Sequence, residues 1–157
     1  DPVGVVNTFK QVRKYVDCQL VLAGGEATDD PEGEAVLNEV RNHVDNDPDI
    51  MVLMLPAFSD KDINALQRAA TVILQKSLKE GFGLTVSEAM WKGKPVIGGA
   101  VGGIPLQIVH GINGFLVHSV EGAAFRIRQF LNNPLPQAWG GGWFFISEAT
   151  TFSYSAI

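Results

Sequence analysis

The sequence has little cysteine, little charge and few cationic residues. Its single cysteine, Cys18, lies in an apolar run and has no partner for a disulfide within the chain. This excludes a disulfide-stabilised scaffold and favours a reducing, cytoplasmic location. The composition, 46% hydrophobic over 157 residues, is that of one globular domain and excludes disorder and collagen-like repeats.

The deficit of cationic residues bears on the partners. The chain has 12 Lys and Arg against 17 Asp and Glu, a net charge of -5. Nucleic acids and anionic membranes attract basic surfaces, so we expect neither as a partner through bulk charge. The histidines, His43, His110 and His118, are scattered, and no aspartate cluster has a convincing set of companion ligands. We therefore expect no metal and no cofactor.

The two ends of the chain differ from its middle. The sequence opens with Asp1-Pro2, without Met or a signal sequence, and we expect a piece of a longer protein. Residues 135–157 hold one charged residue, Glu148, and are rich in aromatic residues. We therefore expect one domain over residues 1–133 and an atypical, low-charge tail over residues 134–157.

Between these ends, helical and strand patterns alternate. Helices have apolar residues three and four positions apart, and buried strands are short apolar runs that end in Gly or Pro. The expected helices are 4–16, 32–44, 59–70, 84–92 and 121–131, and the expected strands are 19–23, 50–55, 71–74, 95–97 and 114–117. This alternation predicts an α/β, Rossmann-like parallel sheet with helices on both faces, whose ligands bind at the carboxyl ends of the strands.

The segment that carries chemistry is KSLKEGFGLTVSEAMWKG, residues 76–93. Here a strand leads through a glycine-containing loop into a helix that begins near Leu84. The first N–H groups of a helix have no partner within the helix, and together with the helix dipole they form an anion site. The glycines let a ligand approach the main chain, so a phosphate would fit here.

Two carboxylates, Glu80 and Glu88, bracket this anion site. Carboxylates repel phosphate and accept hydrogen bonds from hydroxyls, so the pair suits a sugar and a ribose on either side of a diphosphate. The alternative is that 81–83 is a tight turn and Glu88 a surface acid. The residues alone leave both interpretations open.

The run EGFGLTVSEA resembles the acidic motif of retaining nucleotide-sugar glycosyltransferases of the two-Rossmann-domain (GT-B) type, family 4. Its flanks, from VILQKS to GGIPLQIVHGINGFLV, and the runs LVLAGG and PAFSDKDINALQRA are similar to the trehalose-forming members of that family. The resemblance covers about residues 1–133. It implies the C-terminal, donor-binding half of an enzyme that transfers glucose from a nucleoside diphosphate glucose to glucose.

The resemblance also implies roles for individual residues. Glu80 would be the catalytic residue that faces the hydroxyls of the transferred sugar, and Glu88 would hold the ribose. The main chain near the sugar and the diphosphate would come from Gly81, Phe82, Gly83, Leu84 and Thr85. The base would be flanked by Leu55, Pro56 and Phe58. The run 102–105 would close the wall of the cleft, or it would be a plain glycine turn.

The sequence departs from the family in what precedes Asp1. The Arg and Lys that neutralise the diphosphate, and the N-terminal domain that supplies most of the acceptor site, would be expected upstream. Lys76 and Lys79 are the only cations near the motif. We therefore expect the isolated chain to be inactive. The alternatives are a glycogen or sucrose synthase-like transferase domain and a non-catalytic nucleotide-binding or interaction module, and association into oligomers stays open.

Overall fold

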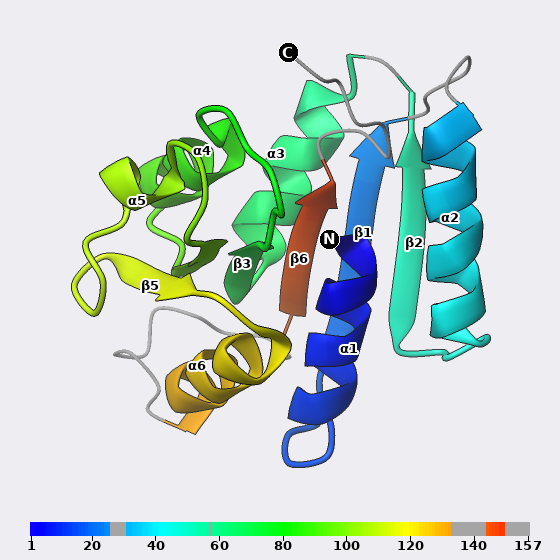
Figure 1. Ribbon diagram of the computed structural model, residues 1–157, viewed down its shortest axis with the longest axis horizontal. Helices are drawn as coiled ribbons and strands as arrows, with labels where there is room; N and C mark the ends of the chain where they lie inside the picture. Colours follow the sequence, from blue (N-terminus) through cyan, green and yellow to red (C-terminus); the bar gives the residue numbers. More distant parts are fainter. Residues whose placement is uncertain (26–30, 57, 133–143, 150–157) are drawn as a thin grey trace.

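A single sheet of parallel strands organises the chain, and the computed structural model describes residues 1–25, 31–56, 58–132 and 144–149 (Figure 1). Its helices are α1 Pro2–Val12, α2 Pro31–Val44, α3 Asp60–Ala69, α4 Leu84–Trp91, α5 Ile104–Gln107 and α6 Val120–Asn132. Its strands are β1 Gln19–Gly25, β2 Ile50–Leu55, β3 Val72–Gln75, β4 Val96–Gly99, β5 Gly114–Val117 and β6 Phe144–Ala149.

The strand order confirms the predicted fold class. The sheet runs β2-β1-β6-β3-β4-β5, and each neighbouring pair is parallel. Since β2 and β3 are consecutive in the predicted pattern yet lie on either side of β1 and β6, the chain changes direction across the sheet between them. Such a switch point is where open α/β sheets bind ligands.

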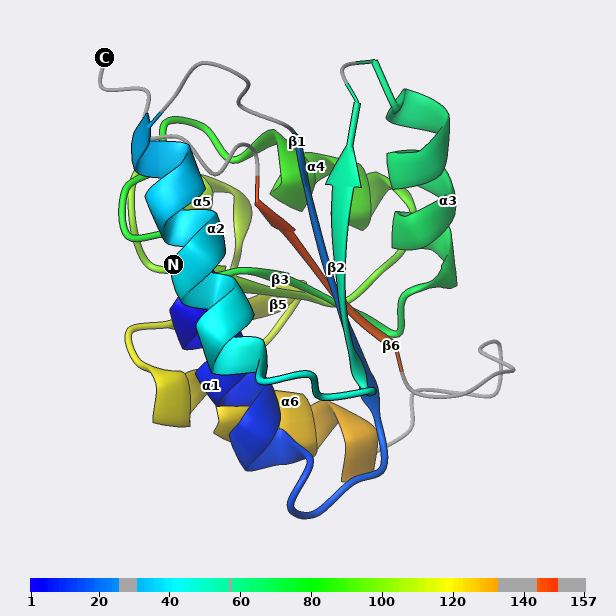
Figure 2. The ribbon, with the colours of Figure 1, turned by 90° about the vertical axis from the view of Figure 1, so that its right-hand side faces the viewer.

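Two hydrophobic cores lie on the two faces of the sheet. Leu20 and Leu22 point into the core formed with α1, α2 and α6, whereas Val21 points into the core formed with α4 and α5. This alternation follows from the two-residue period of a strand. Figure 2 shows α1 and α2 on one side of the sheet and α3 on the other. Helices therefore lie on both faces of the sheet, as predicted.

The first helix is shorter than predicted. Asp1 caps it by accepting a hydrogen bond of 2.9 Å from the Gly4 amide, and it ends at Val12 rather than at residue 16. Beyond Val12 the chain turns, and the Tyr15 ring is exposed and stacks against Arg128 of α6, 3.6 Å from the guanidinium carbon to the ring centre. Tyr15 fitted the helical spacing, but its contact is with a neighbouring helix.

Two elements were not predicted from the sequence. The short helix α5 begins in the second half of the run 102–105, for which a wall of the cleft or a plain glycine turn was expected. Strand β6 lies between β1 and β3 in the sheet, although its residues belong to the segment expected to be an atypical tail. The division of the chain at residue 133 stays a prediction, but part of the tail contributes a strand to the sheet.

Two aromatic residues of the helices are exposed, although aromatic side chains on amphipathic helices usually face the core. Trp91 is 91% exposed, and Phe125 of α6 is also exposed. At about 100° per residue, Trp91 lies about 140° around α4 from the buried Val86, which places it on the outer face. Alanines fill the corresponding inner positions, Ala89 on α4 and Ala123 and Ala124 on α6.

Candidate functional site at the carboxyl edge of the sheet

The loop between β3 and α4 lies at the carboxyl edge of the sheet, as predicted. It runs over residues 76–83 and ends at Gly83, which caps α4 with φ of 80° and ψ of 61°. This left-handed conformation favours glycine. A Cβ atom at this position would also lie 3.0 Å from Cγ1 of Ile104, so glycine is required for both backbone and packing reasons.

The Glu80 carboxylate is held on both of its oxygens. Oε2 accepts hydrogen bonds from Nε2 of Gln75 at 3.0 Å and from the Ser77 hydroxyl at 3.1 Å. Oε1 accepts one from the Gly81 amide at 3.0 Å. All three donors are neutral groups. They fix the orientation of the Glu80 carboxylate without forming an ion pair with it.

The Glu88 carboxylate is held in a similar way from another helix. Oε2 accepts a hydrogen bond of 2.9 Å from Nε2 of Gln67 on α3, and the Oε1 atom of Gln67 accepts one from Lys92. Glu88 itself is exposed and lies in the second turn of α4. The structure therefore places the two acids of the motif on either side of the first turn of α4.

The glycines after β4 pack directly on the Glu80 loop. Gly102 has a φ of 55°, and a Cβ atom there would lie 1.8 Å from the Glu80 carbonyl oxygen. The Gly103 amide donates a hydrogen bond of 2.6 Å to the Gly81 carbonyl. The run 102–105 thus forms a wall against the loop, and its second half is the start of α5.

Gln107 of α5 fixes the other side of the loop. Its Nε2 atom donates to the Phe82 carbonyl, and its Oε1 atom accepts a hydrogen bond of 2.5 Å from the Ser87 hydroxyl. Asn113 in turn donates to the Gln107 carbonyl at 3.0 Å. The loop is therefore tied to α5 as well as to β3, which holds the first turn of α4 in a fixed position.

The first turn of α4 mixes exposed and buried residues. The Phe82 and Leu84 side chains are exposed, whereas Thr85 is buried. The Thr85 side chain thus packs inward, and its main chain lies in the first turn of α4. At a helix N-terminus the helix dipole favours a negative charge.

The residues predicted to flank the base lie at the end of β2. Leu55 is half-buried, Pro56 is exposed, and Phe58 is 96% exposed with a φ of 67°. β1 and β6 lie between β2 and β3, so at about 4.8 Å per strand the two strands are about 14 Å apart. The structure therefore places Glu80 and Glu88 on either side of the first turn of α4 and keeps the Phe58 loop at a distance from β3.

Lys76, one of the two cations near the motif, is engaged elsewhere. Its ammonium group pairs with the Asp1 carboxylate at the start of α1. Burial lowers the pKa of Lys76, although the charge of Glu121 acts in the opposite direction. Lys79 in the same loop is exposed. Lys76, which directly follows β3, thus joins the loop to the N-terminal end of α1.

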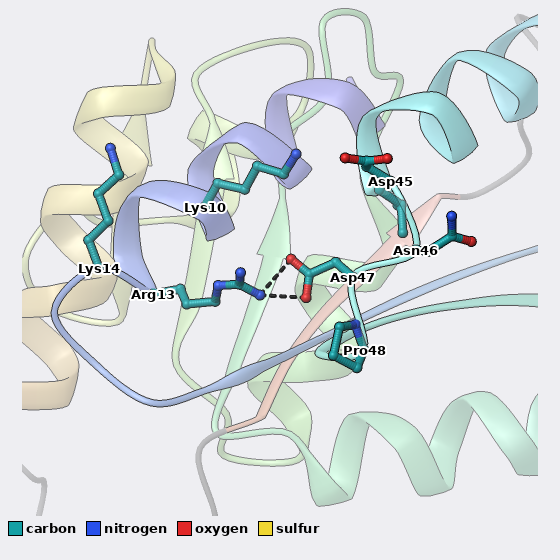
Figure 3. Close-up of a pocket in the computed structure, with 8 residues that line it drawn as sticks. Lys10, Arg13, Lys14, Asp45, Asn46, Asp47 and Pro48 are labelled. Atoms are coloured by element: carbon teal, nitrogen blue, oxygen red, sulfur yellow. Dashed lines mark hydrogen bonds and ion pairs between the residues drawn. The ribbon is translucent and has the colours of Figure 1, made fainter.

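A cavity of about 520 Å³ lies at the opposite, amino edge of the sheet (Figure 3). Nη1 of Arg13 there lies 2.5 Å from both carboxylate oxygens of Asp47. Burial acts to raise the pKa of Asp47, but the Asp49 amide and the Arg13 guanidinium outweigh it and lower the pKa. Lys10 donates to the His43 carbonyl at 2.6 Å. None of the predicted site residues lines this cavity.

In the described part of the chain, no group of three or more His, Cys, Asp or Glu side chains could hold a metal ion. None of the described helices is both long enough and apolar enough to cross a membrane. Cys18 is buried, and burial together with the charge of Asp17 raises its pKa to about 11.

Comparison with solved structures identifies the class of fold. The crystal structure of Anabaena Alr3699/HepE in complex with UDP-glucose superposes with a TM-score of 0.62 at 19% sequence identity, covering 80% of this chain and 45% of that one. The two chains therefore share an α/β, Rossmann-like fold over this region.

Comparison of sequences identifies the family. The family described as Glycosyl transferases group 1 matches residues 2–140, and the chain belongs to it. The trehalose synthases of Pyrococcus horikoshii and Thermococcus litoralis are 46% and 50% identical over 132 and 121 residues, which are 83% and 76% of this chain. The chain spans only 32% and 29% of the lengths of these relatives.

Sequence reasoning missed three glutamines that organise the site. Gln67 and Gln75 each hold one acid of the motif, and Gln107 holds the loop between them. One of them leaves a signal in the sequence, because Gln75 is a polar residue at the end of the buried apolar run of β3. The other two contacts join segments about 20 residues apart and leave no local pattern.

Proposed function

We propose that this chain is the donor-binding domain of a retaining glycosyltransferase that moves glucose from a nucleoside diphosphate glucose to glucose and so forms trehalose. The observation that carries the proposal is the position of Glu80 and Glu88 on either side of the first turn of α4, at the carboxyl edge of the sheet. The similarity to two trehalose synthases supports the choice of sugar and acceptor.

The charges of the site residues indicate which part of the nucleotide sugar each of them would bind. The diphosphate suits the amides of Leu84 and Thr85, since a helix N-terminus favours an anion. The carboxylates would repel phosphate, so they accept hydrogen bonds from hydroxyls. Glu80 then holds the transferred sugar, beside the main chain of 81–83, and Glu88 holds the ribose.

The base lies toward the end of β2 in this proposal. Leu55, Pro56 and the exposed ring of Phe58 offer apolar surface there. The separation of about 14 Å between β2 and β3 suits an extended ligand. A nucleotide sugar is such a ligand, because its base, ribose, diphosphate and sugar follow one another along one line.

Catalysis in this proposal consists of positioning and of stabilising the leaving diphosphate. The acceptor hydroxyl attacks the anomeric carbon from the face on which the diphosphate departs, so the configuration is retained. A phosphate oxygen of the donor takes the proton of that hydroxyl. The N-terminal amides of α4 offset part of the charge that develops on the diphosphate, and we propose that no metal or cofactor takes part.

The partners follow from the same proposal. The chain spans about a third of its relatives, which supports a second domain that supplies most of the acceptor site and the phosphate-binding cations. The buried Cys18 thiol fits the reducing environment of the cytoplasm. The acceptor is a small sugar, and neither a nucleic acid nor a membrane is part of the scheme.

Calorimetric titration of the chain tests the proposal. UDP, ADP and GDP are added separately to the wild type and to Glu88→Ala. At least one nucleotide should bind, and its affinity should fall at least tenfold in the variant, because a charged hydrogen-bond acceptor of the ribose is lost. Glu39→Ala, which removes an exposed acid of α2, is the control and should bind like the wild type.

Three outcomes would contradict the proposal or part of it. No binding of any nucleotide by the wild type would favour an interaction module. Equal binding by wild type and Glu88→Ala would refute the ribose assignment. Disaccharide formed by this chain alone from a nucleoside diphosphate glucose and glucose would refute the need for a second domain.

A further inference from the structure

Buried polar side chains are few in the described part of the chain, and two of them are glutamines. The buried polar or charged residues there are Thr8, Gln67, Gln75, Thr85 and Lys94. Gln67 is 0% exposed and Gln75 is 3% exposed. Each donates its side-chain amide to one carboxylate of the acidic motif, and Gln is seldom buried without such a contact.

Gln75 links β3 to Glu80. Its Nε2 atom lies 3.0 Å from both Oε2 of Glu80 and the Ser77 hydroxyl, so the amide nitrogen must face the carboxylate and the hydroxyl. Its Oε1 atom is buried and has no hydrogen-bond partner in the described part of the structure. A buried hydrogen-bond acceptor without a partner destabilises the fold. The orientation of the Gln75 amide therefore provides the contact with Glu80 at the expense of a partner for its own Oε1 atom.

Gln67 links α3 to Glu88. Its Nε2 atom donates to Glu88 at 2.9 Å, while Lys92 donates to its Oε1 atom. The Lys92 ammonium group therefore binds the carbonyl oxygen of the Gln67 side chain, whereas the amide nitrogen of Gln67 binds Glu88. The Glu88 side chain is exposed, so its carboxylate is accessible to a ligand.

A neutral donor has a different effect on a carboxylate than a cation has. An amide fixes the orientation of the carboxylate and leaves its negative charge uncompensated, whereas Lys or Arg would form a closed ion pair. A carboxylate that has to accept hydrogen bonds from sugar hydroxyls needs a fixed direction and an available charge. Both requirements are met by a buried glutamine behind each acid.

We propose that Gln75 and Gln67 are positioning residues, Gln75 for the contact of Glu80 with the transferred sugar and Gln67 for the contact of Glu88 with the ribose. This inference rests on the proposed function, because it assumes that a nucleotide sugar lies between the two acids. It assigns a separate part of the donor to each glutamine, which makes the two separately testable.

The test compares Gln75→Met with Gln67→Met, which keep side-chain length and remove the amide. UDP and UDP-glucose, with their ADP and GDP counterparts, are titrated into each variant. Gln75→Met should reduce the extra affinity for the glucose-bearing nucleotide at least fivefold and change the affinity for the diphosphate alone less than twofold. Gln67→Met should weaken both ligands by the same factor of about fivefold, because both contain the ribose.

Two measurements guard against a merely structural effect. Gln129→Met, at an exposed position of α6, is the control and should bind both ligands like the wild type. In NMR spectra without ligand, Glu80→Ala should shift the side-chain amide signals of Gln75 and not those of Gln67, and Glu88→Ala should do the reverse. The NMR result does not require the Met variants to fold.

The outcomes separate the two proposals. A wild type that binds no nucleotide overturns the proposed function and this inference with it. Nucleotide binding that is unchanged in both Met variants, or weakened equally for both ligands in Gln75→Met, overturns the inference alone. NMR signals that do not follow the expected pairs also overturn it.

Discussion

The two edges of the sheet treat their carboxylates in opposite ways. At the amino edge, Asp47 is paired with the Arg13 guanidinium at 2.5 Å, and this pair ties the end of α1 to the turn between α2 and β2. At the carboxyl edge, Glu80 and Glu88 are oriented by neutral amides and a hydroxyl. The edge with the cavity thus has its charge compensated, whereas the edge with the motif keeps its charge available for a ligand.

The two edges also differ in the residue types that adopt positive φ values. Positive φ values occur at Asp45 and Asn46 at the amino edge, and these residue types tolerate the left-handed conformation. At the carboxyl edge, the bulky Phe58 adopts it with an almost fully exposed ring. A bulky residue in this conformation is strained, and such strain is concentrated at functional sites.

The largest effect is expected from closing the gap between Gly102 and the Glu80 loop. In Gly102→Ala, the new Cβ atom would overlap the Glu80 carbonyl oxygen at 1.8 Å, at a φ of 55°. We expect a loss of about 3 kcal/mol in the free energy of unfolding, because overpacking and backbone strain combine. Urea denaturation measures this loss, and calorimetry should detect no nucleotide binding.

The neighbouring Gly81→Ala is the control for this experiment. A Cβ atom at Gly81 meets no other atom within 4 Å, so its stability should stay within about 0.5 kcal/mol of the wild type. Equal stability of the two variants would contradict the close packing of Gly102 on the loop. It would also remove the argument that the loop is held in one position.

A medium effect is expected from opening the ion pair at the amino edge. Asp47→Asn should lower the free energy of unfolding by about 1 kcal/mol at pH 7, because the pair with Arg13 is lost. The pKa of Asp47 is lowered in the folded protein, so its contribution is present above its ordinary value of 3.8 and is lost as the pH falls through the folded-state pKa.

The difference between wild type and Asp47→Asn should therefore close as the pH falls below 3.8, which denaturation at a series of pH values measures. Nucleotide affinity at pH 7 should be equal in the two proteins. A weakened affinity would mean that the two edges are coupled, and the contrast between them would no longer hold.

The smallest effect is expected from releasing the strain at Phe58. In Phe58→Gly, the free energy of unfolding should rise by about 0.5 kcal/mol, because glycine adopts the positive φ freely and the exposed ring contributes little packing. Thermal unfolding measures the gain, and nucleotide affinity should fall at the same time. A variant that is less stable than the wild type would show that the ring packs in solution.

Much of the fold and part of the site could be predicted because they depend on local sequence. Apolar spacing gave the main helices, and the glycines and acids of the β3–α4 loop gave the position of the candidate site. The exposure of Trp91 could also have been predicted from its spacing to Val86, because a position about 140° further around a helix lies on the other face.

The remaining features depend on contacts between distant segments. The one-turn helix α5 is fixed by the hydrogen bonds of Gln107 with the Phe82 carbonyl of the loop and the Ser87 hydroxyl of α4, which no periodic pattern predicts. The support of Glu88 by Gln67 joins two helices. Strand β6 has a low-charge aromatic sequence that differs from the other strands, and its position becomes clear only from its pairing with β1 and β3.

Strand β6 also has a consequence for how the chain is made. It follows every other strand in sequence, yet it lies in the middle of the sheet. During synthesis, β1 and β2 can pair with each other and β3, β4 and β5 can pair with one another, but the two groups lack their shared neighbour until β6 has left the ribosome. The unpaired edges of β1 and β3 are open to wrong pairing over that interval, so a chaperone would be most useful before β6 has emerged.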